Sequence, residues 1–276
     1  MKLRFTKMHG LGNDFVMIDA ISQKVSITPE RAAKLADRNL GVGCDQVLVV
    51  EAPTVPDADF RYRIFNHDGS EVENCGNGAR CFAVFVRQRK LTGKRVIRVE
   101  TAGGVLILQV LDNHQVKVDM GVPVLEPADI PFKARAREVS YPLMVSGRTL
   151  DISAVSMGNP HAVTFVDTVL DFDVENLGPQ IESHPDFPSK VNAGFVEVIS
   201  RSEIRLRVFE RGSGETLACG TGACAAVVAG RMRGLLGNSV RVGLAVGSLQ
   251  IEWKGEGTPV MMTGPVATVF HGQVYV

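Results

Sequence analysis

The chain lacks an excess of either charge. Its 276 residues include 30 Lys and Arg and 30 Asp and Glu, so the formal net charge is zero. Proteins that bind nucleic acid or an anionic membrane surface through a basic face need a local excess of positive charge. The balance therefore argues against both kinds of partner, while a hydrophobic fraction of 45% allows a sizeable core.

Long hydrophobic runs are also missing. The longest apolar stretches, near Cys81–Val86 and Ala223–Ala229, are far shorter than the roughly 20 residues of a membrane-spanning helix. The basic start, MKLRFTKMHG, has no apolar segment behind it, so we expect no signal peptide. Five Cys is an odd number in such a chain. These features predict a reduced, cytoplasmic protein with free thiols.

Metal and dinucleotide motifs are absent as well. Neither Cys75 and Cys81 nor Cys219 and Cys224 have CxxC spacing, so no metal site is expected. The segments GNGA and GTGA are rich in glycine, but no G-x-G-x-x-G motif occurs there. We interpret Cys44, Cys81 and Cys224 as packing residues, because free Cys is among the most buried residue types.

What the sequence does contain is an internal repeat. RIFNHDGSEVENCGNGA, from Arg63, aligns with RVFERGSGETLACGTGA, from Arg207, and places Cys75 against Cys219 at a spacing of 144 residues. RVETAGGVLIL and RVGLAVGSLQI follow at a spacing of 143, and Gly12–Asn13 precedes Gly158–Asn159 by 146. A spacing this constant indicates a duplicated half-molecule.

Each repeat reads as a strand, a glycine-rich turn, a helix and a hairpin. Alternating residues in RYRIF and IRLRVF predict half-buried strands, and helical spacing begins after each C-G-x-G. We expect a further helix at Pro29–Asn39 after Thr28, helix ends at Gly93 and Gly234, and hairpin turns at Ala102–Gly104 and Val246–Gly247. Strands dominate, which predicts an α+β fold. The expected halves are residues 1–120 with 265–276, and residues 121–264.

Cys75 and Cys219 occupy equivalent places, each at the start of a helix. Unpaired N–H groups and the helix dipole favour an anion there, so we expect a lowered thiol pKa and a seat for a substrate carboxylate. Halves related by a pseudo-twofold axis would point the two thiols at each other across a cleft. One thiolate could then remove a proton from one face of a carbon while the opposite thiol protonates the other face. This pattern predicts inversion of a stereocentre with no pyridoxal lysine or metal.

The other polar residues admit two interpretations from the residues alone. Arg211 could be a solvated charge or a clamp on a carboxylate, and His161 could be structural or functional. The Asn side chains could support turns or bind a zwitterion; they are Asn13, Asn66, Asn159 and Asn192.

The motifs together resemble the diaminopimelate epimerase family. The segments that carry the resemblance run from residue 8 to about 267: MHGLGNDF, FNHDGSEVENCGNGARC, SMGNPHAV, ERGSGETLACGTGACA and WKG…MTGPV. The resemblance implies a cofactor-independent enzyme that interconverts LL- and meso-2,6-diaminopimelate in bacterial lysine and peptidoglycan synthesis. It implies two similar, mainly β halves, each around a central helix, with Cys75 and Cys219 as the acid/base pair.

The resemblance also implies further site residues and a homodimer. His161 and Glu210 would tune the two thiols. Substrate contacts would come from Asn13, Gln46, Asn66, Gly76, Asn77, Asn159, Asn192, Glu210, Arg211, Gly220 and Thr221. One departure is visible at Phe270, where relatives have a Tyr at the dimer contact, so dimer strength is open.

Two other functions remain as alternatives. A proline or hydroxyproline epimerase would use the same pair of thiols, although its cysteine motifs differ from CGNGARC and ACGTGACA. A redox switch or binding protein would use Cys75 and Cys219 as a reversible disulfide. If the enzyme interpretation holds, the two sulfurs should lie about 7 Å apart or less around one carbon.

Overall fold

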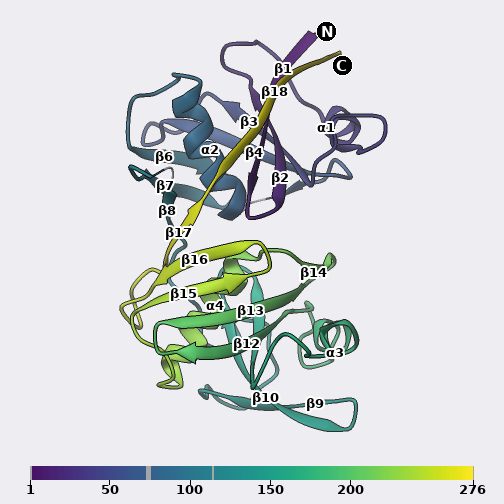
Figure 1. Cartoon of the computed structure of the whole chain (residues 1–276), viewed down its shortest axis with the longest axis vertical. Coiled ribbons are helices and arrows are strands. Elements are labelled where there is room, and N and C mark those ends of the chain that lie inside the picture. The colour runs from purple at the N-terminus through teal and green to yellow at the C-terminus, as the bar shows by residue number, and fades with distance from the viewer. Residues whose placement is uncertain (1, 73–75, 114, 276) are drawn as a thin grey trace. The chain divides into compact units, whose positions relative to one another are not determined.

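The computed structural model describes residues 2–72, 76–113 and 115–275, and the chain forms two compact units (Figure 1). The first unit contains Met1–Asp119 and Thr263–Val276, and the second contains Met120–Met262. Each unit is built from strands with two helices.

The first unit is a mainly antiparallel sheet. Its elements are β1 (Lys2–Gly10), β2 (Asn13–Asp19), α1 (Pro29–Ala36), β3 (Gln46–Glu51), β4 (Phe60–Asn66), β5 (Glu71–Val72), α2 (Gly76–Gln88), β6 (Val96–Thr101), β7 (Gly104–Val110), β8 (Gln115–Asp119) and β18 (Ala267–Tyr275). The strands pair in the order β18, β1, β2, β3, β4, β6, β7, β8, and β5 pairs with β4. Within this order, β2–β3 and β4–β6 are parallel.

The second unit repeats this plan. Its elements are β9 (Tyr141–Val145), β10 (Arg148–Ser156), β11 (Pro160–Val166), α3 (Val174–Glu182), β12 (Asn192–Ser200), β13 (Glu203–Glu210), β14 (Gly214–Thr216), α4 (Gly220–Met232), β15 (Ser239–Leu244) and β16 (Gly247–Glu252). The strands pair in the order β9, β10, β11, β12, β13, β15, β16, with β14 on β13 and with β11–β12 and β13–β15 parallel. Strand β17 (Met261–Pro265) then leads back into the first unit.

Several equivalent strand pairs also have the same register in the two sheets. The pair Phe15↔Gln46 of the first unit corresponds to His161↔Asn192 of the second. In the same way Phe60↔Val99 corresponds to Ile204↔Val242. The third correspondence is between Val99↔Leu106 and Val242↔Leu249. The equivalent helices α2 and α4 each have 13 residues. The sequence repeat is therefore also a repeat of backbone pairing, and the predicted α+β class with two similar, mainly β halves is confirmed.

Each sheet wraps around one helix. Helix α2 contacts β1, β2, β3, β7 and β8, and α4 contacts β10, β11, β12, β13 and β16. Every residue of Asn77–Val86 and of Gly222–Gly230 is buried. A helix enclosed on all sides must be apolar around its circumference, which explains the Ala, Val and Gly content of α4. Figure 1 shows α4 behind the strands of its own unit.

A second helix covers the outer face of each sheet. Helices α1 and α3 connect the parallel strand pairs β2–β3 and β11–β12, because parallel strands require a crossover. Helix α1 begins as predicted, with the Thr28 hydroxyl accepting from the Arg31 N–H at 3.4 Å. It ends at Ala36 rather than Asn39, because the Asp37 carboxylate accepts the N–H groups of Asn39 and Leu40 and makes a turn.

The two enclosed helices end alike but with different residues. Gly234 follows α4 with φ +73°, and the Leu235 N–H donates to the Gly230 carbonyl, so this predicted helix end is confirmed. The prediction of Gly93 for α2 is wrong. Lys90 takes the left-handed position with φ +57°, and the next residue closes the turn on Val86.

The described part of the chain has no helix long and apolar enough to cross a membrane.

The matched helix ends predict stability changes of opposite sign. Gly234→Ala should lower the free energy of unfolding by about 1 kcal/mol, because an L side chain is strained at this φ and a Cβ at this position meets no atom within 4 Å that could add a clash. Lys90→Gly should raise the free energy of unfolding by about 0.5 kcal/mol by relieving the same strain. Urea unfolding followed by circular dichroism measures both, and a shift of the same sign in the two variants would contradict the equivalence.

Candidate active site

The Cys219 thiol lies at the N-terminus of α4. Its Sγ accepts from the Gly222 N–H at 3.4 Å and lies 3.5 Å from the Thr221 hydroxyl. A Cβ at Gly222 would lie 3.2 Å from this sulfur and 3.0 Å from Val208 Cγ2. Glycine is therefore needed for the helix N–H to approach the sulfur so closely. The predicted placement of Cys219 at a helix start is confirmed.

A carboxylate lies against this thiol. The Cys219 thiol donates to Glu210 Oε2 with Sγ and oxygen 3.1 Å apart, and the Thr216 hydroxyl donates to Glu210 Oε1. Glu210 is the last residue of β13 and Thr216 the last of β14, so neighbouring strands supply both groups. The thiol, the carboxylate and the hydroxyl form one chain of hydrogen bonds.

The charge state of Cys219 differs from the expectation. Burial raises the pKa of the Cys219 thiol well above its usual value, and the negative charge of Glu210 raises it further. Hydrogen bonds from Thr221 and Gly222 act in the opposite direction but do not prevail. The prediction of a lowered thiol pKa is therefore wrong for Cys219, because loss of water outweighs the helix terminus.

Four predicted residues meet at the starts of β11 and β12. His161 Nε2 lies 3.1 Å from Asn159 Oδ1, and His161 is paired with Asn192 between the parallel strands. The Asn192 amide donates to the Pro160 carbonyl at 2.8 Å and accepts from the Arg211 N–H at 2.9 Å. Asn192 thus fixes the backbone at Arg211.

His161 is neutral at physiological pH. Burial lowers the pKa of its imidazole to about 3, and the positive charge of Arg211 acts in the same direction. Its Nδ1 is buried and has no hydrogen-bond partner among the described residues. The Asn159 side-chain oxygen accepts a hydrogen bond from the Nε2–H group, which leaves Nδ1 of the neutral ring as an acceptor.

Arg211 itself is exposed, and its guanidinium makes a backbone contact. Nη1 donates to the Ser189 carbonyl at 3.0 Å. The next residue, Gly212, donates its N–H to Glu182 Oε1 at 2.9 Å. The backbone is therefore held at both residues, while the guanidinium keeps donors for a ligand.

In the first unit the predicted residues form two pairs. Gln46 Nε2 donates to Asn66 Oδ1 at 2.9 Å, and Asn77 Nδ2 donates to Asn13 Oδ1 at 3.3 Å. Gln46 Oε1 is buried without a partner in the part of the chain that the structure describes. Cys75 lies outside the described residues, so the predicted separation of the two sulfurs is not measured. Gly76, the residue after it, begins α2.

The topology explains why these residues gather. Strands β2 and β3 start at Asn13 and Gln46 and run parallel, while β4 runs antiparallel and ends at Asn66. Both starts and this end therefore lie at the same edge of the sheet. In the second unit Asn192 starts β12 and Glu210 ends β13 at the matching edge. The repeat offers equivalent positions and fills them with different side chains.

Sequence reasoning missed a charged cluster beside Asn13. Arg38 Nη2 lies 2.8 Å from Asp14 Oδ1 and 2.7 Å from Asp45 Oδ1, and Lys7 contacts Asp14. Burial opposes ionisation of Asp14, but hydrogen bonds from Arg38 and Lys7 hold its pKa well below the usual range. Asp45 in turn accepts from Asn13 Nδ2 at 2.9 Å. Asp14 lies inside the motif MHGLGNDF and Asp45 directly precedes Gln46, and these positions were the available signal.

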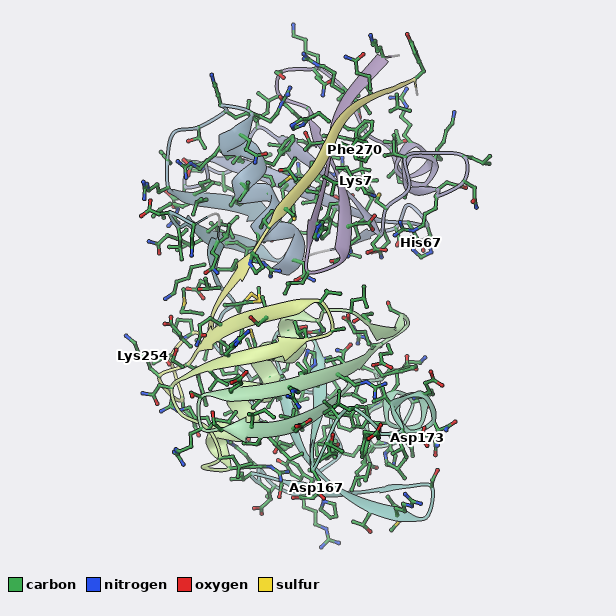
Figure 2. The ribbon with its side chains drawn as sticks, in the orientation of Figure 1. Lys7, His67, Asp167, Asp173, Lys254 and Phe270 are labelled. Carbon is green, nitrogen blue, oxygen red and sulfur yellow. The ribbon has the colours of Figure 1, made fainter. Side chains whose placement is uncertain are left out.

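The remaining cysteines are buried, as predicted for packing residues, and Phe270 lies on β18. Cys44, Cys81 and Cys224 are buried, and burial raises the pKa of Cys44 to about 12. Phe270 lies on β18 opposite Lys7 of β1 (Figure 2). Its ring packs edge-on against Phe5 with centroids 5.8 Å apart. No group of three His, Cys, Asp or Glu suited to a metal ion occurs among the described residues.

Known proteins resemble this chain over its full length. The family model described as diaminopimelate epimerase matches residues 5–126 and 153–269. Diaminopimelate epimerase of Teredinibacter turnerae is 71% identical over 274 residues, and that of Pseudomonas entomophila is 59% identical; each match covers 99% of both chains.

Solved structures with low identity share the fold. A hydroxyproline epimerase from Agrobacterium vitis aligns with a TM-score of 0.68 at 17% identity, covering 99% of this chain and 92% of that one. A PhzF-family phenazine biosynthesis protein from Bacillus anthracis aligns with a TM-score of 0.71 at 20% identity over the whole of both chains. The motifs around the two cysteines, the repeated fold and relatives of up to 71% identity agree, and the chain belongs to the diaminopimelate epimerase family.

Proposed function

We propose that the protein interconverts LL- and meso-2,6-diaminopimelate by a two-thiol mechanism that uses Cys75 and Cys219. The observation that supports this most directly is the Cys219–Glu210 contact at the start of α4, at the position equivalent to Cys75 in the repeat. The reaction would serve bacterial lysine and peptidoglycan synthesis, and the enzyme would be an isomerase of the cytoplasm.

The proposed reaction moves only protons. A thiolate takes the proton from the α-carbon, and the electron pair of the broken C–H bond moves into the carboxyl group as an enediolate. The thiol on the opposite face then gives its proton to the carbon, and a new C–H bond forms with inverted configuration. No electron acceptor is needed, so the proposal includes no cofactor. One thiol would act on each face of the carbon.

The surroundings of Cys219 suit the acid role in the resting enzyme. A buried thiol with a raised pKa keeps its proton until a strong base, such as the enediolate carbon, forms beside it. In the reverse direction Cys219 must act as the base, and Glu210 is placed to accept its proton at 3.1 Å. The first-turn N–H groups of α4 are donors of the kind that stabilise an enediolate.

The other predicted residues would bind the substrate away from the reacting carbon. Arg211 presents a guanidinium on a backbone fixed by Asn192, which suits a carboxylate. The buried acceptor of Gln46 suits an ammonium group. Recognition of the distal amino-acid end by hydrogen bonds would reject shorter substrates strongly, because they leave buried polar groups unpaired.

Substitution of either cysteine should nearly abolish epimerisation. Cys75→Ser and Cys219→Ser should each lower kcat by at least about 10³-fold, since a serine hydroxyl is a far weaker acid than a thiol and supplies no anion to act as the base near neutral pH. Proton NMR in heavy water follows turnover and entry of deuterium at the α-carbon, with Cys44→Ser as the matched control. Normal turnover in either cysteine variant would contradict the two-thiol mechanism.

The same assay separates the alternatives. Racemisation of proline or hydroxyproline without turnover of diaminopimelate would indicate the neighbouring epimerase activity. If neither substrate is turned over and the two thiols are oxidised reversibly, the protein would instead be a redox switch.

Because the folded state keeps His161 neutral, we predict that the free energy of unfolding falls at acidic pH. The unfolded state binds a proton near pH 6.5 and the folded state only near pH 3, so stability is complete above pH 6.5 and falls as the pH drops between these values. The loss should be about 1.4 kcal/mol per pH unit relative to His161→Gln, which lacks this titration. Urea unfolding at pH 7 and pH 5 tests this, with the exposed His271→Gln as control. Parallel stability curves for wild type and His161→Gln would refute it.

We propose further that the enzyme is a homodimer through β18. This strand exposes Val269 and Tyr275 and leaves Phe270 46% exposed, so three large apolar or aromatic side chains lie on one strand. The aromatic ring of Phe270 is held by Phe5 and so can be presented without loss of order. Because Phe270 lacks the hydroxyl of the Tyr expected at this position, it would contribute to the dimer contact through apolar packing alone.

Removal of this ring should weaken the dimer. Phe270→Ala should raise the dimer dissociation constant about 10-fold or more, as expected for losing a buried aromatic side chain. Sedimentation velocity across a concentration series measures the constant. The control is Val105→Ala on β7, whose side chain is also exposed. A monomeric wild type, or equal effects of both variants, would overturn the assignment of β18.

A further inference from the structure

A short hairpin stands next to the Cys219–Glu210 contact. Strand β14 pairs with the end of β13 through Val208↔Thr216, Phe209↔Glu215 and Glu210↔Gly214. Two residues, Leu217 and Ala218, then lead to Cys219 at the start of α4. The position of β14 therefore decides what surrounds the Glu210 carboxylate.

A two-pronged ion pair holds this hairpin in each repeat. Arg207 Nε and Nη2 donate to the two oxygens of Glu215 at 2.6 and 2.9 Å. In the first unit Arg63 makes the same pair with Glu71 at 2.7 Å for both bonds. Such bidentate pairs fix orientation as well as distance. Arg207 Nη1 also donates to the Val169 and Phe172 carbonyls, which ties the hairpin to the segment before α3.

The repeats differ at the residue after the glutamate. In the second repeat it is Thr216, whose hydroxyl donates to Glu210 Oε1. In the first repeat it is Val72, which has no hydroxyl, and the residue equivalent to Glu210 is Asn66. The hydroxyl and the carboxylate therefore occur together in one repeat and are both missing from the other.

The two oxygens of Glu210 have separate partners. Oε1 accepts from Thr216 and Oε2 lies against the Cys219 thiol. Two fixed contacts on one carboxylate leave it no freedom to rotate about its last bond. Without the hydroxyl, one end of the carboxylate would be released while the backbone of β13 stayed in place.

We infer that Thr216 is a positioning residue: its hydroxyl holds the Glu210 carboxylate against the Cys219 thiol, on a hairpin fixed by the Arg207–Glu215 pair. The inference rests on the proposed function, since it assigns Thr216 a part in proton transfer at Cys219. It predicts an effect on one thiol only, because the first repeat has Val72 at this place.

Thr216→Val tests this by removing one hydroxyl while keeping the shape of the side chain. We expect kcat to fall about 10- to 100-fold in both directions with KM changed less than about 3-fold, as for loss of a hydrogen bond to a charged group. Thr216→Ser keeps the hydroxyl and should recover turnover to within about 3-fold of wild type. Unchanged turnover in Thr216→Val, or failure of Thr216→Ser to recover it, would overturn the inference.

A second readout does not depend on substrate. Alkylation by iodoacetamide, resolved by peptide mass spectrometry, follows Cys219 and Cys75 separately across pH. The charged group against the Cys219 thiol is Glu210 of β13, and the hydroxyl beside it is Thr221 of α4. Release of Glu210 in Thr216→Val should move the Cys219 profile to lower pH and leave the Cys75 profile unchanged. Equal shifts at both thiols, or none, would contradict the positioning role.

The two readouts keep the failures apart. A wild type that does not epimerise diaminopimelate would refute the proposed function, while a shifted Cys219 profile in the same experiment would still support the role of Thr216.

Discussion

The contact between the buried Cys219 thiol and the Glu210 carboxylate is the interaction on which the candidate site depends. A thiol at a helix N-terminus in water would ionise more readily, because the dipole contributes about 0.3–1 kcal/mol in favour of the anion. Complete burial disfavours the thiolate by up to about 3–5 pKa units, roughly 4–7 kcal/mol. Burial therefore decides the charge state, and Glu210 adds to its effect.

The repeated sheet explains how such a contact can be built twice and then modified. Both halves bring two strand starts, one strand end and a helix start to the same edge, and β2, β3 and β4 pair in the same register as β11, β12 and β13. The backbone thus supplies equivalent positions, and divergence acts on single side chains. Gln46 and Asn192 share one position and Asn66 and Glu210 another, so the same scaffold presents an amide in one half and a carboxylate in the other.

Periodicity and turn residues predicted the features that depend on local sequence. The repeat, the start of α1 after Thr28, the helix start at Cys219 and the turn before Gly247 follow from such signals. Helix α3 was not predicted, because Gly178 and Pro179 are residues that normally end helices. Gly178 is present because its position packs against the Phe209 ring. The end of α2 was also missed, because Lys90 takes the left-handed conformation at a position where the sequence has no Gly or Asn to indicate it. The raised pKa of Cys219 and the role of Thr216 depend on burial and on contacts between strands, which spacing along the chain does not contain.

The asymmetry of the halves has a chemical consequence for a reversible two-thiol enzyme. The two sulfurs must hold opposite protonation states when the carbon loses its proton, yet a perfect duplication would give both thiols the same affinity for a proton. Glu210 lies beside Cys219, whereas the equivalent residue of the first repeat is Asn66, and this difference removes the symmetry. The Glu210 carboxylate raises the pKa of the Cys219 thiol and so favours its protonated form at rest, and Oε2, 3.1 Å from Sγ, also offers an acceptor when the reaction runs backward. Divergence at Glu210 and Thr216 thus lies where the chemistry requires the halves to differ, while the Arg–Glu pairs that only hold the hairpins remain the same in both.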